Sequence, residues 1–212
     1  MRAVLWDLDG TLADSGEFHW RAWRDTMAAA GEPITHAQFL ASFGQRNDAI
    51  LTKWLGDRAD AARCREIGDA KEALYRRLIQ AEGIAPLPGA AEWVARLHAR
   101  GWRQAIASSA PRANVEVMAD VLGLRAAMGA LVSAEDVPRG KPEPDVFLAA
   151  AAKLDTPPNR CVVVEDADAG IEAAHRAGMR RIGVGRPNFD GADISVVTLA
   201  DLPDDSFDRL VE

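Results

Sequence analysis

Cysteine is scarce in this sequence: Cys64 and Cys161 are the two cysteines among 212 residues. They lie far apart, and neither belongs to a Cys-x-x-Cys or Cys/His pattern, so the sequence predicts neither a disulfide framework nor a zinc site. Cys161 opens the apolar run 161–164, where a small buried residue is the ordinary interpretation. A chain of this kind suits a reducing compartment, and we expect a cytoplasmic protein.

The sequence also lacks an uninterrupted apolar stretch of membrane-spanning length, and its first residues do not combine a basic region with an apolar stretch and a cleavage site. Positive charge is not in excess either, because 25 Lys and Arg stand against 32 Asp and Glu, for a formal net charge of −7. We therefore expect no membrane and no nucleic-acid partner. Any phosphate must be bound by a local positive site.

Internal repeats and low-complexity tracts are missing as well, and the 48% of hydrophobic residues argue against disorder. Helical patterns cover 90–99, 110–122 and 145–154 and separate short apolar segments that are rich in β-branched residues. The sequence therefore predicts an α/β fold, a Rossmann-like parallel sheet with helices on both faces. The segments expected to form strands are 3–6, 104–107, 130–132, 161–164 and 181–184.

The connection between the first two predicted strands is unusually long. Most of residues 12–101 has a helical period, and this is far more than one crossover helix needs. We expect an inserted α-helical cap domain at 15–86, with the α/β core formed by 1–14 and 87–212, because prolines and a glycine punctuate the chain at 86–89. Breaks at 31–33 and Gly44 predict about four short helices in the insertion.

Two carboxylates follow the first predicted strand: Asp7 and Asp9 stand two residues apart. In an extended chain this spacing turns both side chains to the same side, and open parallel sheets bind ligands beyond the carboxyl ends of their strands. Acids so close would repel each other unless they shared a cation. The pattern therefore predicts a divalent metal.

Further polar residues follow the other predicted strands. Glu165 and Asp166 come directly after the strand 161–164, and carboxylates converging on one sheet edge suit Mg2+. Ser108 ends the second strand, and Lys141 lies between Gly140 and Pro142. Their hydroxyl and ammonium groups can bind phosphoryl oxygens.

Each of these features has a structural alternative when taken alone. An Asp-x-Asp-Gly stretch occurs in turns and calcium loops, Ser108 could cap a helix, and Lys141 could be a solvated surface charge. Glu165 and Asp166 could cap a helix over about 170–177. The catalytic interpretation is favoured because all of them follow strands or lie in adjoining loops, in a consistent order.

Together these segments resemble the four signature motifs of the haloacid dehalogenase superfamily. The resemblance covers nearly the whole chain, and a helical insertion directly after the first motif is similar to the subgroup with a small α-helical cap. That subgroup includes β-phosphoglucomutases and the phosphatases of phosphoglycolate and sugar phosphates. In this sequence the matching segments are 7–15, Ser108, Gly140-Lys141-Pro142, and Glu165-Asp166 through Gly178-Met179.

The resemblance implies a mechanism that these residue types can support. Asp7 is the expected nucleophile, which forms an aspartyl-phosphate, and Asp9 is the expected general acid and base. Mg2+ would offset the negative charge, as phosphoryl transfer requires. The expected metal ligands are Asp7, Asp9 through its carbonyl, Asp166 and, in the outer shell, Glu165; the expected phosphate-binding residues are Ser108, Ser109 and Lys141.

Substrate-binding residues are expected in the cap. His19 and Trp23 stand four apart on its first predicted helix and would share one face, and the subgroup is similar in having a His and a Trp here. Arg46 and Lys71 resemble its cationic cap positions. Core packing is the alternative for Trp23, and a solvated charge is the alternative for Arg46 and Lys71.

The resemblance implies a Mg2+-dependent phosphatase of a small phosphorylated metabolite, such as a sugar phosphate or a phosphoglycolate-like compound, acting as a monomer or weak homodimer. The alternative is a β-phosphoglucomutase-type enzyme. The Ser108-Ser109 pair favours the mutase branch, whereas Arg46, one place nearer its glycine than in a mutase, favours hydrolysis. A dehalogenase would not need Asp9, and a binding protein would have little reason to keep Asp7 with the other polar residues.

Overall fold

The computed structural model of the chain describes residues 1–42 and 45–211. The chain divides into two compact units: Met1–Asp14 with Ala85–Glu212 (the core unit), and Ser15–Ile84 (the helical unit). The sequence placed the second border of the insertion at residue 86, and the structure places it at Ile84. The helix break predicted at Gly44 lies outside the described residues.

The core unit is built on one parallel sheet of six strands, in the order β3-β2-β1-β4-β5-β6. Parallel strands end at a common edge, so residues that follow β1, β2 and β4 come together there. The central strand β1 has β2 and β4 as neighbours, which sets Asp7 between Ser108 and Glu165. The strands are β1 (Ala3–Trp6), β2 (Arg103–Ala107), β3 (Ala130–Val132), β4 (Cys161–Glu165), β5 (Arg180–Val184) and β6 (Ile194–Val196).

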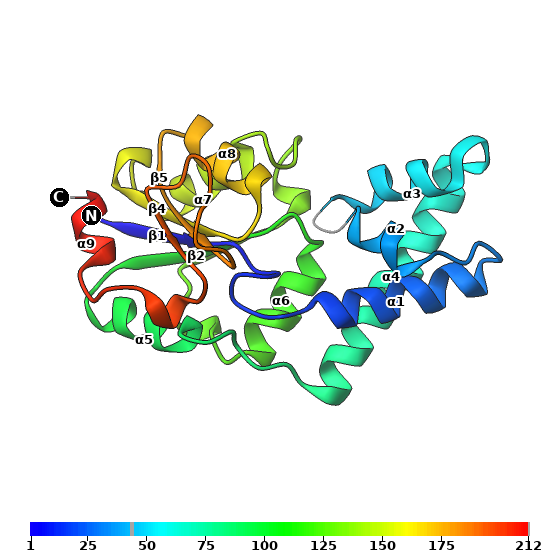
Figure 1. Cartoon of the computed structure of the whole chain (residues 1–212), viewed down its shortest axis with the longest axis horizontal. Coiled ribbons are helices and arrows are strands. Elements are labelled where there is room, and N and C mark those ends of the chain that lie inside the picture. Colours follow the sequence, from blue (N-terminus) through cyan, green and yellow to red (C-terminus); the bar gives the residue numbers. More distant parts are fainter. Residues whose placement is uncertain (43–44, 212) are drawn as a thin grey trace. The chain divides into compact units, whose positions relative to one another are not determined.

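Helices cover both faces of this sheet (Figure 1). Alternate residues of a strand point to opposite faces, so Ala3 and Leu5 pack with α7 (Asp145–Lys153) and α8 (Asp168–Arg176) in one buried cluster. Figure 1 shows α5 (Ala90–Ala99) and α6 (Arg112–Val121) on the other side. There Trp6 meets Phe207 of α9 (Ser206–Val211), with ring centroids 5.9 Å apart. The prediction of an α/β fold with helices on both faces is confirmed.

Two local predictions need correction. The edge strand β6 has three half-buried residues and was missed, because so short a segment carries no clear alternation. The helix after β4 starts at Asp168, two residues before the expected start, because Ala167 already has the extended conformation of a cap residue.

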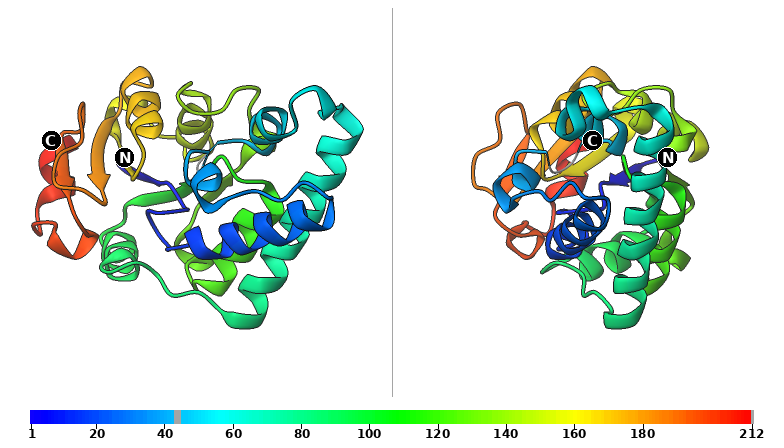
Figure 2. Two further views of the ribbon diagram at one scale, coloured as in Figure 1. Left: turned by 45° about the vertical axis from the view of Figure 1, so that its right-hand side comes forward. Right: turned by 90° about the vertical axis from the view of Figure 1, so that its right-hand side faces the viewer.

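The helical unit contains α1 (Gly16–Ala29), α2 (His36–Leu40), α3 (Asn47–Leu55) and α4 (Ala61–Glu82). Helices α1 and α4 pack on each other (Figure 2), and an apolar cluster around Trp23 and Leu51 fills the space between the helices. Four short helices were expected, but α4 is long: its 22 residues, Ala61–Glu82, lie between the cap residues Asp60 and Gly83. No helix in the described ranges is long and apolar enough to cross a membrane.

Candidate active site

The first motif continues β1 beyond its last residue. The Asp7 N–H donates to the Val164 carbonyl at 2.9 Å, so the pairing of β1 with β4 still holds where the chemistry begins. The chain then turns back, because Gly10 N–H bonds to the Ala13 carbonyl at 2.8 Å and Leu12 N–H bonds to the Leu8 carbonyl at 2.9 Å. Asp7 is thus held at the end of a buried strand.

Lys141 joins the carboxyl ends of β1 and β4. Its ammonium lies 2.5 Å from Asp7 Oδ1 and 2.5 Å from Glu165 Oε1, and all three side chains are nearly buried. The other oxygen of Glu165 accepts from the Ala167 N–H at 2.8 Å. Each oxygen of Glu165 therefore accepts a hydrogen bond. The bond from the Ala167 N–H holds the carboxylate in place, and the carboxylate in turn fixes the position of the Lys141 ammonium.

The carboxylates crowd one another. Burial raises the pKa of Asp7 well above its usual value despite the attraction of Lys141, and Glu165 and Asp166 raise it further. Burial, with the repulsion of Glu165, raises the pKa of Asp166 to about 7. Burial also disfavours the Lys141 ammonium, but Asp7 and Glu165 outweigh it and hold its pKa above the usual value. Several neighbouring residues with shifted pKa values are typical of a functional site.

Two glycines make room for these acids. Gly10 has φ +88°, and a Cβ there would lie 2.1 Å from Asp166 Oδ2. A Cβ at Gly170, inside α8, would lie 1.8 Å from Glu165 Oε1. Neither position can carry a side chain unless a site carboxylate moves.

Ser108 follows β2 at the same edge. Its N–H donates to the Val132 carbonyl at 3.0 Å, and its buried hydroxyl accepts from the Ala110 N–H at 3.0 Å. Ser109 is next in the chain and half-buried. The helix α6 begins a few residues later, but the N–H of its first residue, Arg112, donates to the Glu135 carboxylate at 2.9 Å. The two serine hydroxyls are therefore the groups on this side that could bind phosphoryl oxygens.

The residues present fit a divalent cation. Within the described ranges, Asp7, Glu165 and Asp166 each offer a carboxylate oxygen, and these atoms lie within 4.8 Å of one another. Asp9, which raises the pKa of Asp166 by repulsion, adds a fourth carboxylate beside a single ammonium. An incoming phosphate would meet net negative charge there, and hard oxygen donors suit Mg2+. The carboxylate of Asp9 is not in the three-residue group, so its expected part through the main-chain carbonyl stays a prediction.

Three of the four predicted cap residues come together inside the helical unit. Lys71 Nζ lies 2.9 Å from His19 Nδ1 and 5.1 Å from the ring centroid of Trp23. Trp23 is buried in the apolar cluster, which is the packing alternative that the sequence left open. Arg46 precedes α3 and pairs with Asp48 at 3.6 Å. The roles of all four in substrate binding stay predictions.

Sequence reasoning missed several residues of these two clusters. Glu72 Oε1 accepts from Lys71 at 2.8 Å and from Asn47 Nδ2 at 2.7 Å, and no local pattern indicates that pairing. Gly170 could have been found, because a lone glycine in a helical pattern usually has a packing reason. The hydroxyl of Thr11 is buried without a hydrogen-bond partner among the described residues, inside the first motif.

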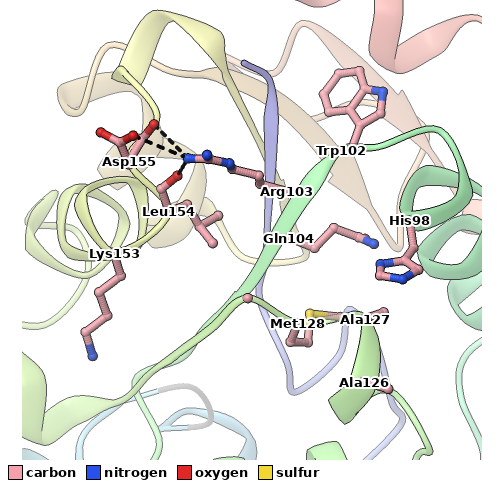
Figure 3. Close-up of a pocket in the computed structure, with 11 residues that line it drawn as sticks. His98, Trp102, Arg103, Gln104, Ala126, Ala127, Met128, Lys153, Leu154 and Asp155 are labelled. Atoms are coloured by element: carbon pink, nitrogen blue, oxygen red, sulfur yellow. Dashed lines mark hydrogen bonds and ion pairs between the residues drawn. The ribbon is translucent and has the colours of Figure 1, made fainter.

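A cavity of about 510 Å³ lies elsewhere in the core unit. Figure 3 shows Arg103 and Gln104, at the start of β2, among the residues that line it. That is the amino end of the strand, whereas Ser108 follows its carboxyl end. The Arg103 guanidinium bonds the carbonyl of Asp155 at 3.0 Å, so it caps the end of α7. This cavity is therefore not the candidate active site.

Residues 1–178 match the haloacid dehalogenase-like hydrolase family. The chain belongs to this family. Hexitol phosphatase B of Escherichia coli strain K12 is 34% identical over 213 residues, which cover 94% of this chain and 93% of that protein. β-Phosphoglucomutase of Bacillus subtilis strain 168 is 32% identical over 211 residues, 95% of this chain and 92% of that protein. The crystal structure of CbbY from Rhodobacter sphaeroides in complex with phosphate has a TM-score of 0.85 at 29% identity and covers 95% of this chain and 96% of that one.

The predicted resemblance to the haloacid dehalogenase family and the prediction of an enzyme with phosphatase and phosphomutase relatives are confirmed. Comparison of whole chains does not test individual residues, so the roles of Asp7, Asp9 and the other site residues stay predictions. The same holds for a cytoplasmic location and for the oligomeric state.

Proposed function

We propose that this chain is a Mg2+-dependent phosphatase that hydrolyses a small phosphorylated metabolite through an aspartyl-phosphate on Asp7. The observation that carries the proposal is the convergence of Asp7, Lys141 and two further acids at the carboxyl edge of one parallel sheet. A binding protein would gain nothing from burying several carboxylates around one ammonium, because buried charges cost stability unless they are paired.

The reaction needs two steps. In the first, a carboxylate oxygen of Asp7 attacks phosphorus, the bond from phosphorus to the ester oxygen breaks, and Asp9 gives its proton to the leaving alcohol. In the second, Asp9 takes a proton from water as the water oxygen attacks the aspartyl-phosphate, which releases inorganic phosphate and restores Asp7. No other co-reactant is needed.

The remaining residues would bind and orient the phosphoryl group. Lys141 sits between Asp7 and Glu165, so its charge is available beside the attacking oxygen. The hydroxyls of Ser108 and Ser109 offer hydrogen-bond donors on the β2 side. Mg2+ held by Asp7 and Asp166 would offset the charge between carboxylate and phosphate. Donors fixed in advance around the transferring group supply most of the catalysis in phosphoryl transfer.

The substrate class is proposed from the relatives. A hexitol phosphatase and a β-phosphoglucomutase are similar to this chain over nearly their full lengths, which supports a phosphorylated sugar or sugar alcohol. The runner-up function is a phosphomutase, supported by the second of these relatives. A mutase would return the phosphoryl group to another hydroxyl instead of to water.

The test is turnover of a panel of sugar, sugar-alcohol and glycolate phosphates by the purified chain, with Mg2+ and with a chelator. We expect phosphate release that requires Mg2+ and is lost in the chelator. Glucose 6-phosphate formed from β-glucose 1-phosphate, with little free phosphate, would favour the mutase. Robust turnover without any divalent metal would contradict both.

The nucleophile has its own test. Asp7→Asn should lower turnover roughly a thousandfold or more, because the amide is a poor nucleophile. Asp193→Asn is the matched control: Asp193 pairs with Arg181 at the start of β5, at the opposite edge of the sheet. A folded Asp7→Asn variant as active as this control would rule out the mechanism.

A further inference from the structure

Asp136, in the turn after β3, accepts more hydrogen bonds than an ordinary surface acid. Its Oδ2 accepts from the Ser133 N–H at 2.8 Å, from the Ser133 hydroxyl at 2.9 Å and from the Arg112 guanidinium. Its Oδ1 accepts from Lys153 at 2.8 Å. Partial burial works to raise the pKa of Asp136, but the bonds from Lys153 and Ser133 outweigh it and hold the pKa well below its usual value.

These bonds fasten the turn after β3 to the loop after β2. Ser133 and Asp136 form a reciprocal cap that closes the turn 133–136. From this turn the Ala134 N–H donates to the Ala110 carbonyl at 3.0 Å, and Ala110 in turn donates to the Ser108 hydroxyl at 3.0 Å. The Arg112 guanidinium adds a second tie, from the first turn of α6 to Asp136.

The same turn leads to the third motif. Lys141, whose ammonium reaches Asp7 and Glu165, lies five positions after Asp136. Lys153, the last residue of α7, ties Asp136 to the carboxyl end of the helix whose amino end follows the Lys141 loop. Asp136 thus contacts the helix that follows the Ser108 loop directly, and it is linked to the Lys141 loop through the chain 137–140 and through α7.

We propose that Asp136 is a positioning residue of the phosphoryl site, which holds the Ser108 loop and the Lys141 loop in register with each other without touching the substrate. The inference rests on the proposed function for its meaning in turnover. It extends that function, because Asp136 lies outside the predicted site residues. Ser108 and Lys141 are the residues that Asp136 helps to position. Loss of Asp136 should therefore weaken binding of the phosphoryl group.

The physical reason is geometric. Donors that bind a phosphoryl group must be set within a fraction of an ångström, and a misplacement of about 1 Å can cost about a hundredfold in rate. Asn at position 136 keeps the shape but has one acceptor oxygen and no charge, so it cannot serve Ser133, Arg112 and Lys153 together. Among the described residues, the Ser108 loop would then be held to the turn after β3 only by the bonds from the Ala134 N–H to the Ala110 carbonyl and from the Arg112 N–H to the Glu135 carboxylate, so it would be less tightly positioned.

The matched control is again Asp193→Asn. Asp193 is equally buried, with 18% of its side chain exposed against 16% for Asp136, and it accepts from the N–H and guanidinium of Arg181. Both substitutions remove one carboxylate charge from a paired acid, so both should lower thermal stability. Only the Asp136 variant should change the phosphoryl site.

Inorganic phosphate is the probe, titrated in Mg2+ by calorimetry into wild type, Asp136→Asn and Asp193→Asn. We expect phosphate affinity about tenfold weaker in the Asp136 variant and unchanged within about twofold in the control, with kcat/KM lowered about ten- to a hundredfold. In a Ser108→Ala background, Asp136→Asn should add far less than its own loss, because the two act through one loop. A purely structural role would lower stability without this non-additivity.

Equal phosphate affinity in the two Asn variants, or losses that multiply in the double variant, would overturn the inference. A wild type that binds no phosphate would overturn it as well. Wild type that binds phosphate but turns over no ester would instead sink the proposed function, and phosphate affinity would still decide the role of Asp136. If Asp136→Asn does not fold, Arg112→Ala replaces it, because 39% of that side chain is exposed; unchanged phosphate affinity there would refute the tie.

Discussion

Glu165 occupies the space that a side chain on residue 170 would need: a Cβ at Gly170 would lie 1.8 Å from Glu165 Oε1. The carboxylate of Glu165 in turn holds Lys141 at 2.5 Å. The missing side chain at Gly170, inside α8, leaves room for the Glu165 carboxylate, and that carboxylate positions the ammonium group of Lys141 in a different segment of the chain. This relationship can be tested by adding one methyl group.

Gly170→Ala should displace the Glu165 carboxylate, loosen Lys141 and lower kcat/KM about ten- to a hundredfold. Gly68→Ala is the matched control, because Gly68 also lies inside a helix and its Cβ would meet nothing closer than 3.8 Å. That control should gain about 0.5–1 kcal/mol of stability from helix propensity and keep its activity. Equal kinetics in the two variants would show that Glu165 can move at no cost to the site.

Lys141→Met should leave Asp7 and Glu165 buried without their common cation. Removing one partner of a buried ion pair costs about 3–5 kcal/mol, and we expect a loss of that size in urea unfolding together with loss of turnover. Adding Glu165→Gln should recover part of the stability, because one uncompensated charge is gone, but no activity. A double variant no more stable than Lys141→Met would show that Glu165 is not the source of the cost.

Stability without metal should depend on pH through Asp166, whose pKa is raised to about 7 by burial and by Glu165. The folded protein then keeps a proton that the unfolded chain loses near its ordinary carboxyl pKa. The free energy of unfolding should therefore fall as pH rises from about 4 to about 7, by at most about 1.4 kcal/mol per pH unit for this group.

Urea unfolding in chelator at several pH values, on wild type and Asp166→Asn, measures this contribution. The variant should be more stable than wild type near pH 7.5, on the order of 1–2 kcal/mol, and less sensitive to pH. Mg2+ should stabilise wild type far more than the variant. Parallel pH curves for the two proteins in chelator would contradict the assignment.

Lys71 and Glu72 form a buried ion pair in the helical unit, 2.8 Å apart, with 2% and 8% of their side chains exposed. Lys71→Met should destabilise this unit by about 3–5 kcal/mol, because Glu72 would lose its cation. Lys53→Met is the control, because Lys53 is exposed on α3. Its free energy of unfolding should stay within about 0.5 kcal/mol of wild type.

Lys71→Met together with Glu72→Gln should recover most of that loss, and it also tests the predicted role of Lys71 in substrate binding. A double variant that is stable but has a raised KM would favour a contact with substrate. A double variant with unchanged kinetics would leave Lys71 a purely structural group. Trp23 and Trp54, whose rings are 5.0 Å apart, are two of the six tryptophans, so the change in fluorescence relative to the Lys53→Met control reports whether the variant is folded.

The core motifs could be predicted because their logic is local. Asp7 and Asp9 follow a buried apolar strand, as do Glu165 and Asp166, and a parallel sheet brings strand ends to one edge. The spacing Ser133-x-x-Asp136 is itself typical of a capping pattern, but nothing in the sequence indicates that the capped turn is linked to Ser108. That link runs through the Ala110 carbonyl, which any residue could supply.

The helical unit was harder to predict. Helical periodicity indicated an insertion, but His19, Lys71 and Glu72 look like solvent-facing residues when each is taken alone. The packing of α1 on α4 buries Lys71 between Trp23 of α1 and Tyr75 of its own helix. Propensity and spacing within one helix carry no information about which charges a second helix will cover.

The sequence by itself determined the parallel α/β sheet, the insertion and the acids at the strand ends, because continuous apolar runs, helical periodicity and strand-end position are properties of short segments. Tertiary structure alone decided which charges are paired and which crowd: Lys141 shared by Asp7 and Glu165, Gly170 yielding its space, and Asp136 tying two loops. The contacts of Lys141 and Asp136 join segments far apart in the chain, and even Gly170 and Glu165, five positions apart, meet only because β4 and α8 fold against each other. Burial in a low-dielectric interior strengthens the charged contacts.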